Sequence, residues 1–231
     1  MASWVEEIYR LSKIAVSQPH AAYAAFTHGV SLRCTYLART FPHISELLRP
    51  IKDAVRQHFL PAITGRQAFS DAERRLFTLP GRLGGLAVPD VVLSADANYD
   101  ESMRVSAPLC ALVALQTAPQ GDVDYDQCRI KSATSAAKRT MLVREQQAIK
   151  HSSLVLQCAI ELACKKGASA WLTALPLDEL GFHLHKAAFR DGISLRYGWP
   201  LTNLPLECVC GHPMGVDHAL SCPCGFPLIE A

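Results

Sequence analysis

Four residues able to bind a metal lie within fifteen positions near the C-terminal end of the chain, in the pattern Cys-x-Cys-x7-His-x3-Cys. The four residues are Cys208, Cys210, His218 and Cys222. Soft sulfur and nitrogen ligands of this kind hold Zn²⁺ tetrahedrally in structural sites. His218 and Cys222 are four residues apart, so one turn of helix places both on the same face. The spacing therefore predicts a small segment organised by zinc.

The ligand set has alternatives within the same segment. A single residue separates Cys208 from Cys210, which is tighter than the two to four residues usual in zinc fingers. His212 and Cys224 lie within reach and could replace a member of the set, and the four residues could also be an unconnected group in a cysteine-rich tail. The remaining cysteines are scattered among apolar residues, which favours buried thiols in a reducing, intracellular compartment over a disulfide framework; they are Cys34, Cys110, Cys128, Cys158 and Cys164.

Apolar residues in the rest of the chain recur at helical spacing. The pattern predicts helices over residues 4–16, 51–59 (stopped by Pro61), 89–114, 125–150, 153–166 and 186–197. A capping box, Ser70 with Glu73, predicts a short helix that starts there. No stretch shows the alternation expected of strands. The predicted fold is mainly α: a multi-helix bundle followed by a small C-terminal segment of the zinc-knuckle kind.

Two stretches rich in glycine and proline interrupt these helices. Residues 79–86 contain three glycines, but no Lys-Ser/Thr follows at the spacing of a phosphate loop, so a structural turn is favoured. Residues 118–121 read Ala-Pro-Gln-Gly and predict a linker. The expected organisation is a helical region over 1–117, linker helices over 118–200 and the knuckle over 201–231.

Charge is segregated although the net charge is only +2. Acidic residues dominate 90–126, and basic residues dominate 129–150. This segregation favours equally a phosphate-facing surface and two helices that face each other. If the basic side chains meet phosphate, the candidate nucleic-acid contacts are Lys131, Lys138, Arg139 and Arg144, joined by Arg190 and Arg196. Trp171 and Trp199 lie in apolar company, which favours a core role over base stacking.

Several separated stretches resemble one protein family. The segment 208–222, which ends in His-Ala-Leu-x-Cys, resembles the CCHC knuckle of non-LTR retrotransposon polyproteins of the restriction-like-endonuclease type. Residues 168–177 and 189–200 are similar to the stretch before that knuckle. Residues 18–29 and 79–86 are similar to the region just after the polymerase palm. One departure lies beyond Cys222, where Pro-Cys-Gly-Phe lacks one glycine of the related pattern Cys-x-x-Gly-Gly-Phe.

The resemblance implies a post-palm thumb or linker region joined to a knuckle that positions nucleic acid. It also implies that the catalytic motifs lie beyond both ends of this sequence. The chain has no Asp-Asp pair for two-metal phosphoryl transfer, and no Asp/Glu-x-Lys follows Pro89-Asp90. We therefore expect a catalytically silent module that binds RNA or DNA, with no membrane partner and no small-molecule substrate. The alternative is a helical protein–protein adaptor in which the knuckle is structural.

Overall fold

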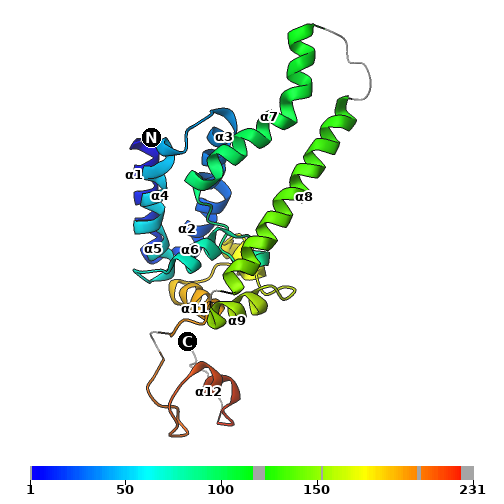
Figure 1. Ribbon diagram of the computed structural model, residues 1–231. Helices are drawn as coiled ribbons and strands as arrows, with labels where there is room; N and C mark the ends of the chain where they lie inside the picture. The colour runs from blue at the N-terminus through cyan, green and yellow to red at the C-terminus, as the bar shows by residue number, and fades with distance from the viewer. Residues whose placement is uncertain (1, 117–122, 152, 202–203, 225–231) are drawn as a thin grey trace. The chain divides into compact units, whose positions relative to one another are not determined.

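The computed structural model describes residues 2–116, 123–151, 153–201 and 204–224, and these residues form helices and turns without a β-strand (Figure 1). The prediction of a mainly α fold is confirmed. The chain divides into two compact units, Met1–Gly198 and Trp199–Ala231. The boundary predicted at residue 118 falls within 117–122, outside the described residues.

The first half of the larger unit is a group of packed helices. In chain order its elements are α1 (Ala2–Ser17), α2 (Pro19–Ala25), the π-helix η1 (Phe26–Val30), α3 (Ser31–Thr40), η2 (Glu46–Leu48), α4 (Arg49–Ala54), the π-helix η3 (Val55–Phe59), α5 (Leu60–Thr64), α6 (Asp71–Thr78) and η4 (Gly81–Leu83).

The second half of this unit begins with two long helices and ends with shorter ones. They are α7 (Val91–Leu115), α8 (Val123–Lys150), α9 (Leu154–Ala163), α10 (Ala170–Thr173), η5 (Asp178–Leu180) and α11 (Lys186–Arg196). The smaller unit contains α12 (Val216–Ser221). In the described part of the chain, every helix is too short or too polar to cross a bilayer.

Two π-turns each place a phenylalanine in the core of the N-terminal helices. The rings of Phe26, in η1, and Phe59, in η3, stack with their centroids 4.5 Å apart, and both side chains are buried. The prediction that Pro61 stops its helix is wrong, because η3 runs directly into α5, which contains Pro61. The helix ends only at Gly65, which has the left-handed backbone conformation. A π-turn widens the helix just before Pro61, and this offset relieves the clash that a proline ring makes with the preceding turn.

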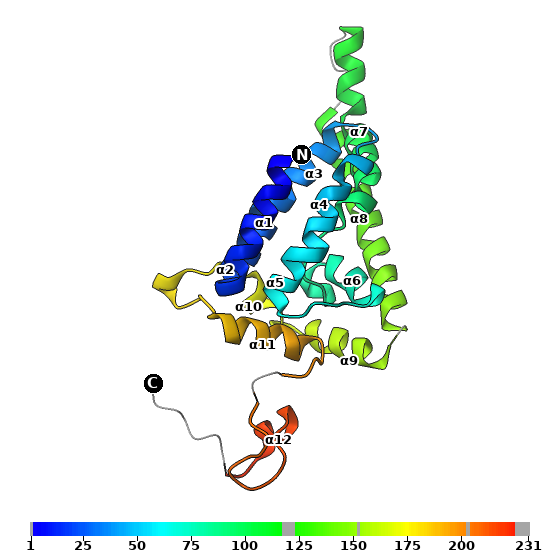
Figure 2. The same ribbon diagram turned by 90° about the vertical axis from the view of Figure 1, so that its left-hand side faces the viewer.

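The helices α7 and α8 run side by side as an arm that extends beyond the other helices of this unit (Figures 1 and 2). Asp90 caps α7, since its carboxylate accepts hydrogen bonds from the N–H groups of Val92 and Leu93. The capping box predicted at Ser70 and Glu73 is present at the start of α6. Arg75 of α6 forms an ion pair with Glu145 at 2.6 Å, which joins α6 to the C-terminal part of α8.

The turn after α6 holds the middle of this unit together, as a structural turn rather than a phosphate loop. Tyr23 donates a hydrogen bond from its hydroxyl to the carbonyl of Leu86 at 2.8 Å, and Tyr197 donates one to Gly84 at 3.1 Å. Both tyrosines are buried. The turn therefore links α2 to the end of α11 through hydrogen bonds that the polar ends of buried aromatic residues require.

His20 joins α2 to the segment before α11. Its Nδ1 accepts a hydrogen bond from the N–H of Leu184 at 3.1 Å, its Nε2 lies 3.2 Å from the carbonyl of Ala174, and its ring stacks on Phe189. The side chain is completely buried. Burial is the main cause that lowers the pKa of His20 below its ordinary value of 6.5; the bond to Ala174 opposes the shift, and nearby His183 adds to it.

We expect His20 to make the folded protein less stable in mild acid. Because its pKa is lower in the folded state, the unfolded chain binds the proton more readily. The stabilisation is complete above the unfolded pKa of 6.5 and declines as pH falls through the lower folded pKa. Urea unfolding across this range measures the loss, and His20→Gln, whose amide can donate and accept, should flatten the pH profile. An unchanged profile in His20→Gln would assign the acid sensitivity to other groups.

Candidate metal centre

The smaller unit brings its chemistry-bearing residues together on a short turn. The N–H of Cys208 donates to the carbonyl of His212 and the N–H of Gly211 donates to the carbonyl of Cys208, both at 2.8 Å. An isolated antiparallel bridge joins Glu207 to Pro213. Gly211 has a φ of 81°, which a residue without a Cβ adopts at little cost. These bonds fold the chain back directly after Cys210.

A single helical segment supplies the other two side chains. Gly215 precedes α12, and the N–H of Ala219 donates to the carbonyl of Gly215 at 2.8 Å. The N–H of Cys222 donates to the carbonyl of His218 at the same distance, so the helical turn continues to Cys222. The spacing of four residues therefore places the imidazole and the thiol on one face, as the sequence predicts.

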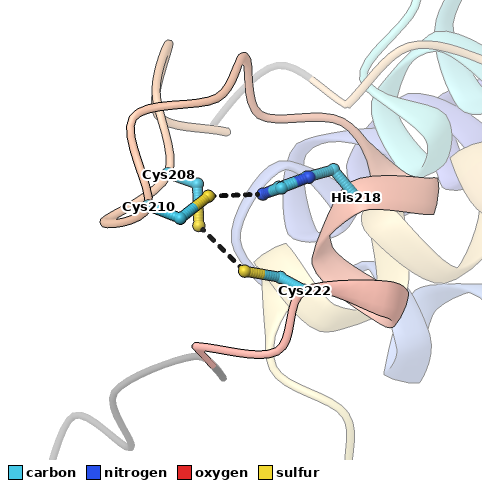
Figure 3. Close-up of side chains that lie close together, drawn as sticks. All are labelled: Cys208, Cys210, His218 and Cys222. Atoms are coloured by element: carbon cyan, nitrogen blue, oxygen red, sulfur yellow. Dashed lines mark hydrogen bonds between the residues drawn. The ribbon is translucent and has the colours of Figure 1, made fainter.

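The four side chains converge on a common centre (Figure 3). The Sγ atoms of Cys208 and Cys222 are 3.6 Å apart, and the Sγ of Cys210 lies 3.1 Å from Nε2 of His218. All four ligand atoms lie within 4.8 Å of one another. Two sulfurs bound to one tetrahedral zinc at 2.3 Å are about 3.8 Å apart. The arrangement can therefore hold a metal ion with small adjustments of the side chains.

The surroundings of Cys208 favour the thiolate form that metal binding requires. The side chain is buried, whereas those of Cys210, His218 and Cys222 are half-buried. The hydrogen bond from the backbone N–H of Cys210 is the main cause that lowers the pKa of Cys208 to about 6. Near neutral pH this thiol is consequently ready to bind a cation.

The two alternative ligands, His212 and Cys224, lie outside the group of four converging side chains. Among the described residues, the only set of histidine, cysteine and carboxylate groups close enough to share an ion is Cys208, Cys210, His218 and Cys222. Cys224 is exposed and lies outside it. The ring of His212 stacks on His218 with centroids 5.8 Å apart, and its Nδ1 lies 3.5 Å from the Sγ of Cys210. His212 thus flanks the site and steadies the orientation of the His218 ring.

Comparison with known proteins adds no relative from which this site could be interpreted. No protein-family model, no curated protein and no solved structure matches the chain. The chemistry of the site therefore follows from its own donor atoms.

The basic residues predicted on the long helix are on the surface of α8. Lys131, Lys138, Arg139 and Arg144 are all exposed. The ammonium of Lys138 lies 4.0 Å from the carboxylate of Glu101 on α7, so at this point the basic and acidic segments face each other. Within the described residues, Lys131, Arg139 and Arg144 have no carboxylate partner. The facing-helix explanation therefore holds for Lys138, whereas a phosphate contact stays a prediction for Lys131, Arg139 and Arg144.

The two arginines predicted on α11 differ in their surroundings. Arg190 is half-buried and donates from Nη2 to the carbonyl of Ala62 at 2.6 Å. Arg196 departs from the predicted phosphate contact, because it is only 9 % exposed and is committed to internal acceptors. Its Nη2 donates to the carbonyl of Gly81 at 2.7 Å, and its Nη1 donates to the hydroxyl of Ser169 at 3.1 Å. It ties the end of α11 to the turn after α6.

Trp171 is likewise placed for packing. Its ring meets that of Phe189 edge-on with centroids 5.8 Å apart, and its Nε1 donates to the carbonyl of Ala168. A Cβ on Gly192 would lie 3.3 Å from the ring, so the absence of a side chain there lets α11 approach it closely. A base could not stack on this face of the indole.

Proposed function

We propose that Cys208, Cys210, His218 and Cys222 bind one zinc ion, and that the chain is a catalytically silent nucleic-acid-binding module of the retroelement reverse-transcriptase type. The observation that carries the proposal is the convergence of the four ligand atoms within 4.8 Å. Three sulfurs and one imidazole nitrogen suit zinc better than they suit the hard cations, which prefer oxygen ligands. With four protein ligands no coordination position stays open for water, so the ion would hold the fold of the segment.

The charge distribution supports nucleic acid as the partner. Lys131, Arg139 and Arg144 are exposed on α8 and have no carboxylate neighbour in the described part of the chain. Exposed cations of this kind bind phosphates by releasing condensed counterions. The resemblance to retrotransposon polyproteins, in which the knuckle is associated with nucleic acid, supports the same partner.

Removing the three α8 cations tests this proposal. In the zinc-loaded protein, we expect the triple alanine variant of Lys131, Arg139 and Arg144 to bind short single-stranded RNA and DNA more weakly than the unchanged protein. Each lost phosphate contact lowers the salt slope for a single strand by about 0.7, so the slope should fall by about two. Fluorescence anisotropy at several salt concentrations measures both quantities.

The matched control removes the same charge elsewhere. Lys165, Lys166 and Lys186 are exposed and were not predicted to bind, so their triple alanine variant should retain the slope of the unchanged protein. An equal loss in both triple variants would show attraction by overall charge alone. Binding that is absent or insensitive to salt in the unchanged protein would contradict the proposal.

A protein–protein adaptor is the second candidate, and one observation favours it. Large apolar side chains on the α7–α8 arm are exposed, among them Leu93 at 77 %, Val113 at 73 % and Leu115 at 71 %. Leu109 and Val113 are four residues apart on α7, so they are neighbours on one helix face, and contiguous exposed apolar groups mark surfaces that another protein covers. If the protein does not bind single strands, protein–protein binding becomes the better explanation of the exposed side chains on α7 and α8.

A further inference from the structure

An open groove with a volume of about 600 Å³ lies on the larger unit, between α1, the segment from η3 to residue 67, and α11. Its volume falls within the range of about 300–1,000 Å³ that is usual for small-molecule sites. Polar side chains from these segments line it, among them Tyr9, Lys13, Gln57, His58, Gln67 and Arg190. Its lining residues all belong to Met1–Gly198, and none of them is among the four residues of the metal centre.

Irregular backbone shapes two walls of this groove. Gln57 and His58 lie in the π-turn η3, where neighbouring Phe59 is buried in the core. Short π-turns inside helices occur frequently at functional sites. At the end of α5, Gly65 has a φ of 79°, and a Cβ there would lie only 3.3 Å from Cδ of Arg190. A residue without a side chain thus lets the arginine lie against the helix end.

The groove offers positive charge that no carboxylate of the described residues neutralises, although Nη2 of Arg190 also donates to the carbonyl of Ala62 at 2.6 Å. Its one acidic side chain, Glu6, forms an ion pair with Arg10 at 3.1 Å. Within the described residues, neither Lys13 nor Arg190 has a carboxylate neighbour. The Nε of Arg190 is buried without a hydrogen-bond acceptor, and burial lowers the pKa of this guanidinium. A partly desolvated cation gains more from a bound anion than one surrounded by water.

Beside these cations lie groups that recognise flat, polar molecules. The rings of Tyr9 and His58 meet edge-on with centroids 4.7 Å apart, and Tyr9 remains 36 % exposed. Gln57 and Gln67 are exposed, and their amides can both donate and accept hydrogen bonds, as the edges of nucleobases do. Aromatic rings, amides and cations are the groups with which proteins bind bases and phosphates, and this groove holds all three.

We propose that this groove binds a nucleotide, with the phosphate at Lys13 and Arg190 and the base beside Tyr9, His58 and the two glutamines. The nucleotide is either free or part of a single strand, and both forms present the same phosphate and base. The lining residues come from segments far apart in the sequence, and no local pattern marks them as neighbours.

Titration of the zinc-loaded full chain with uridine monophosphate, a short oligouridylate and inorganic phosphate tests the proposal. We expect both nucleotide probes to bind, and Lys13→Glu to weaken them by about 10-fold or more, which corresponds to about 1.4 kcal/mol, because the variant replaces a charge-assisted contact to phosphate with a like charge. Lys13 is exposed on α1, so the variant should fold. Lys166→Glu, an identical charge change outside the groove, should alter binding less than twofold.

The three probes separate the sources of the ligand. Tighter binding of the oligouridylate than of the mononucleotide assigns the groove to a strand, and equal binding assigns it to a free nucleotide. Gln67→Ala should weaken both nucleotides without affecting inorganic phosphate. Equal binding of inorganic phosphate and the nucleotides would overturn the assignment, as would equal losses in Lys13→Glu and Lys166→Glu or the absence of binding by every probe.

Discussion

Replacing Cys210 with serine is expected to lower the affinity of the C-terminal segment for zinc by more than about 100-fold. The Sγ of Cys210 lies 3.1 Å from Nε2 of His218, within the proposed ligand set. Loss of a group that merely orients a metal ligand costs about 10–100-fold in affinity, so loss of a ligand should cost more. Competition with a chromophoric chelator measures the affinity. Hydrogen exchange should show lost protection after Trp199 and unchanged protection in Met1–Gly198.

Cys224→Ser is the matched control, since it makes the same change two residues beyond Cys222. Cys224 is exposed and lies outside the convergent set, so we expect wild-type affinity. Zinc binding that survives Cys210→Ser but is lost in Cys224→Ser would show that the ligand set is permuted. Increased exchange throughout Met1–Gly198 in Cys210→Ser would contradict the independence of the helical unit, which has its own core.

A single methyl group at Gly85 is expected to destabilise the larger unit by at least about 3 kcal/mol, more than is usual for overpacking. A Cβ built there would overlap the carbonyl oxygen of Leu79, and it would lie 2.5 Å from the carbonyl oxygen of Leu76. These are backbone atoms, so no rotation of a side chain relieves the clash. The turn that accepts hydrogen bonds from Tyr23 and Tyr197 would have to move. Urea denaturation of Gly85→Ala, followed by circular dichroism, measures the loss.

Gly29→Ala makes the same chemical change where there is space. No atom lies within 4 Å of a Cβ at Gly29, which is in η1. Alanine restricts the unfolded chain more than glycine does, so this variant should be about 0.5–1 kcal/mol more stable than the unchanged protein. If Gly85→Ala behaves like Gly29→Ala, the close approach at the turn is not a constraint on the fold.

Local patterns were sufficient for most helices. The capping box at Ser70 and the amphipathic spacing of residues 51–59 depend only on neighbours in the sequence, and both predicted helices are present. The absence of strand alternation is a local pattern too, and the described residues form no strand. The convergence of the four metal-site side chains was also predictable, because they lie within fifteen residues and a turn followed by one helical turn brings them together. Pro61 was misjudged because the helix continues through it by way of the π-turn η3, a backbone offset that the spacing of apolar residues does not reveal.

Long-range packing determined what each cation can do. In sequence, Arg190 and Arg196 are equivalent basic residues on one short helix. In the structure, Arg196 donates to the carbonyl of Gly81 and becomes internal, whereas Arg190 lines an open groove with Lys13. Both guanidinium groups donate to backbone carbonyls, Arg196 to Gly81 and Arg190 to Ala62, and they differ in how far packing encloses them. Residues far apart in the chain meet only when helices pack, and packing then decides whether a charge is enclosed or stays open to solvent. The helices and the grouping of the four metal-site side chains thus follow from local pattern, whereas the positions of the charges that stay on open surfaces follow from packing between distant segments.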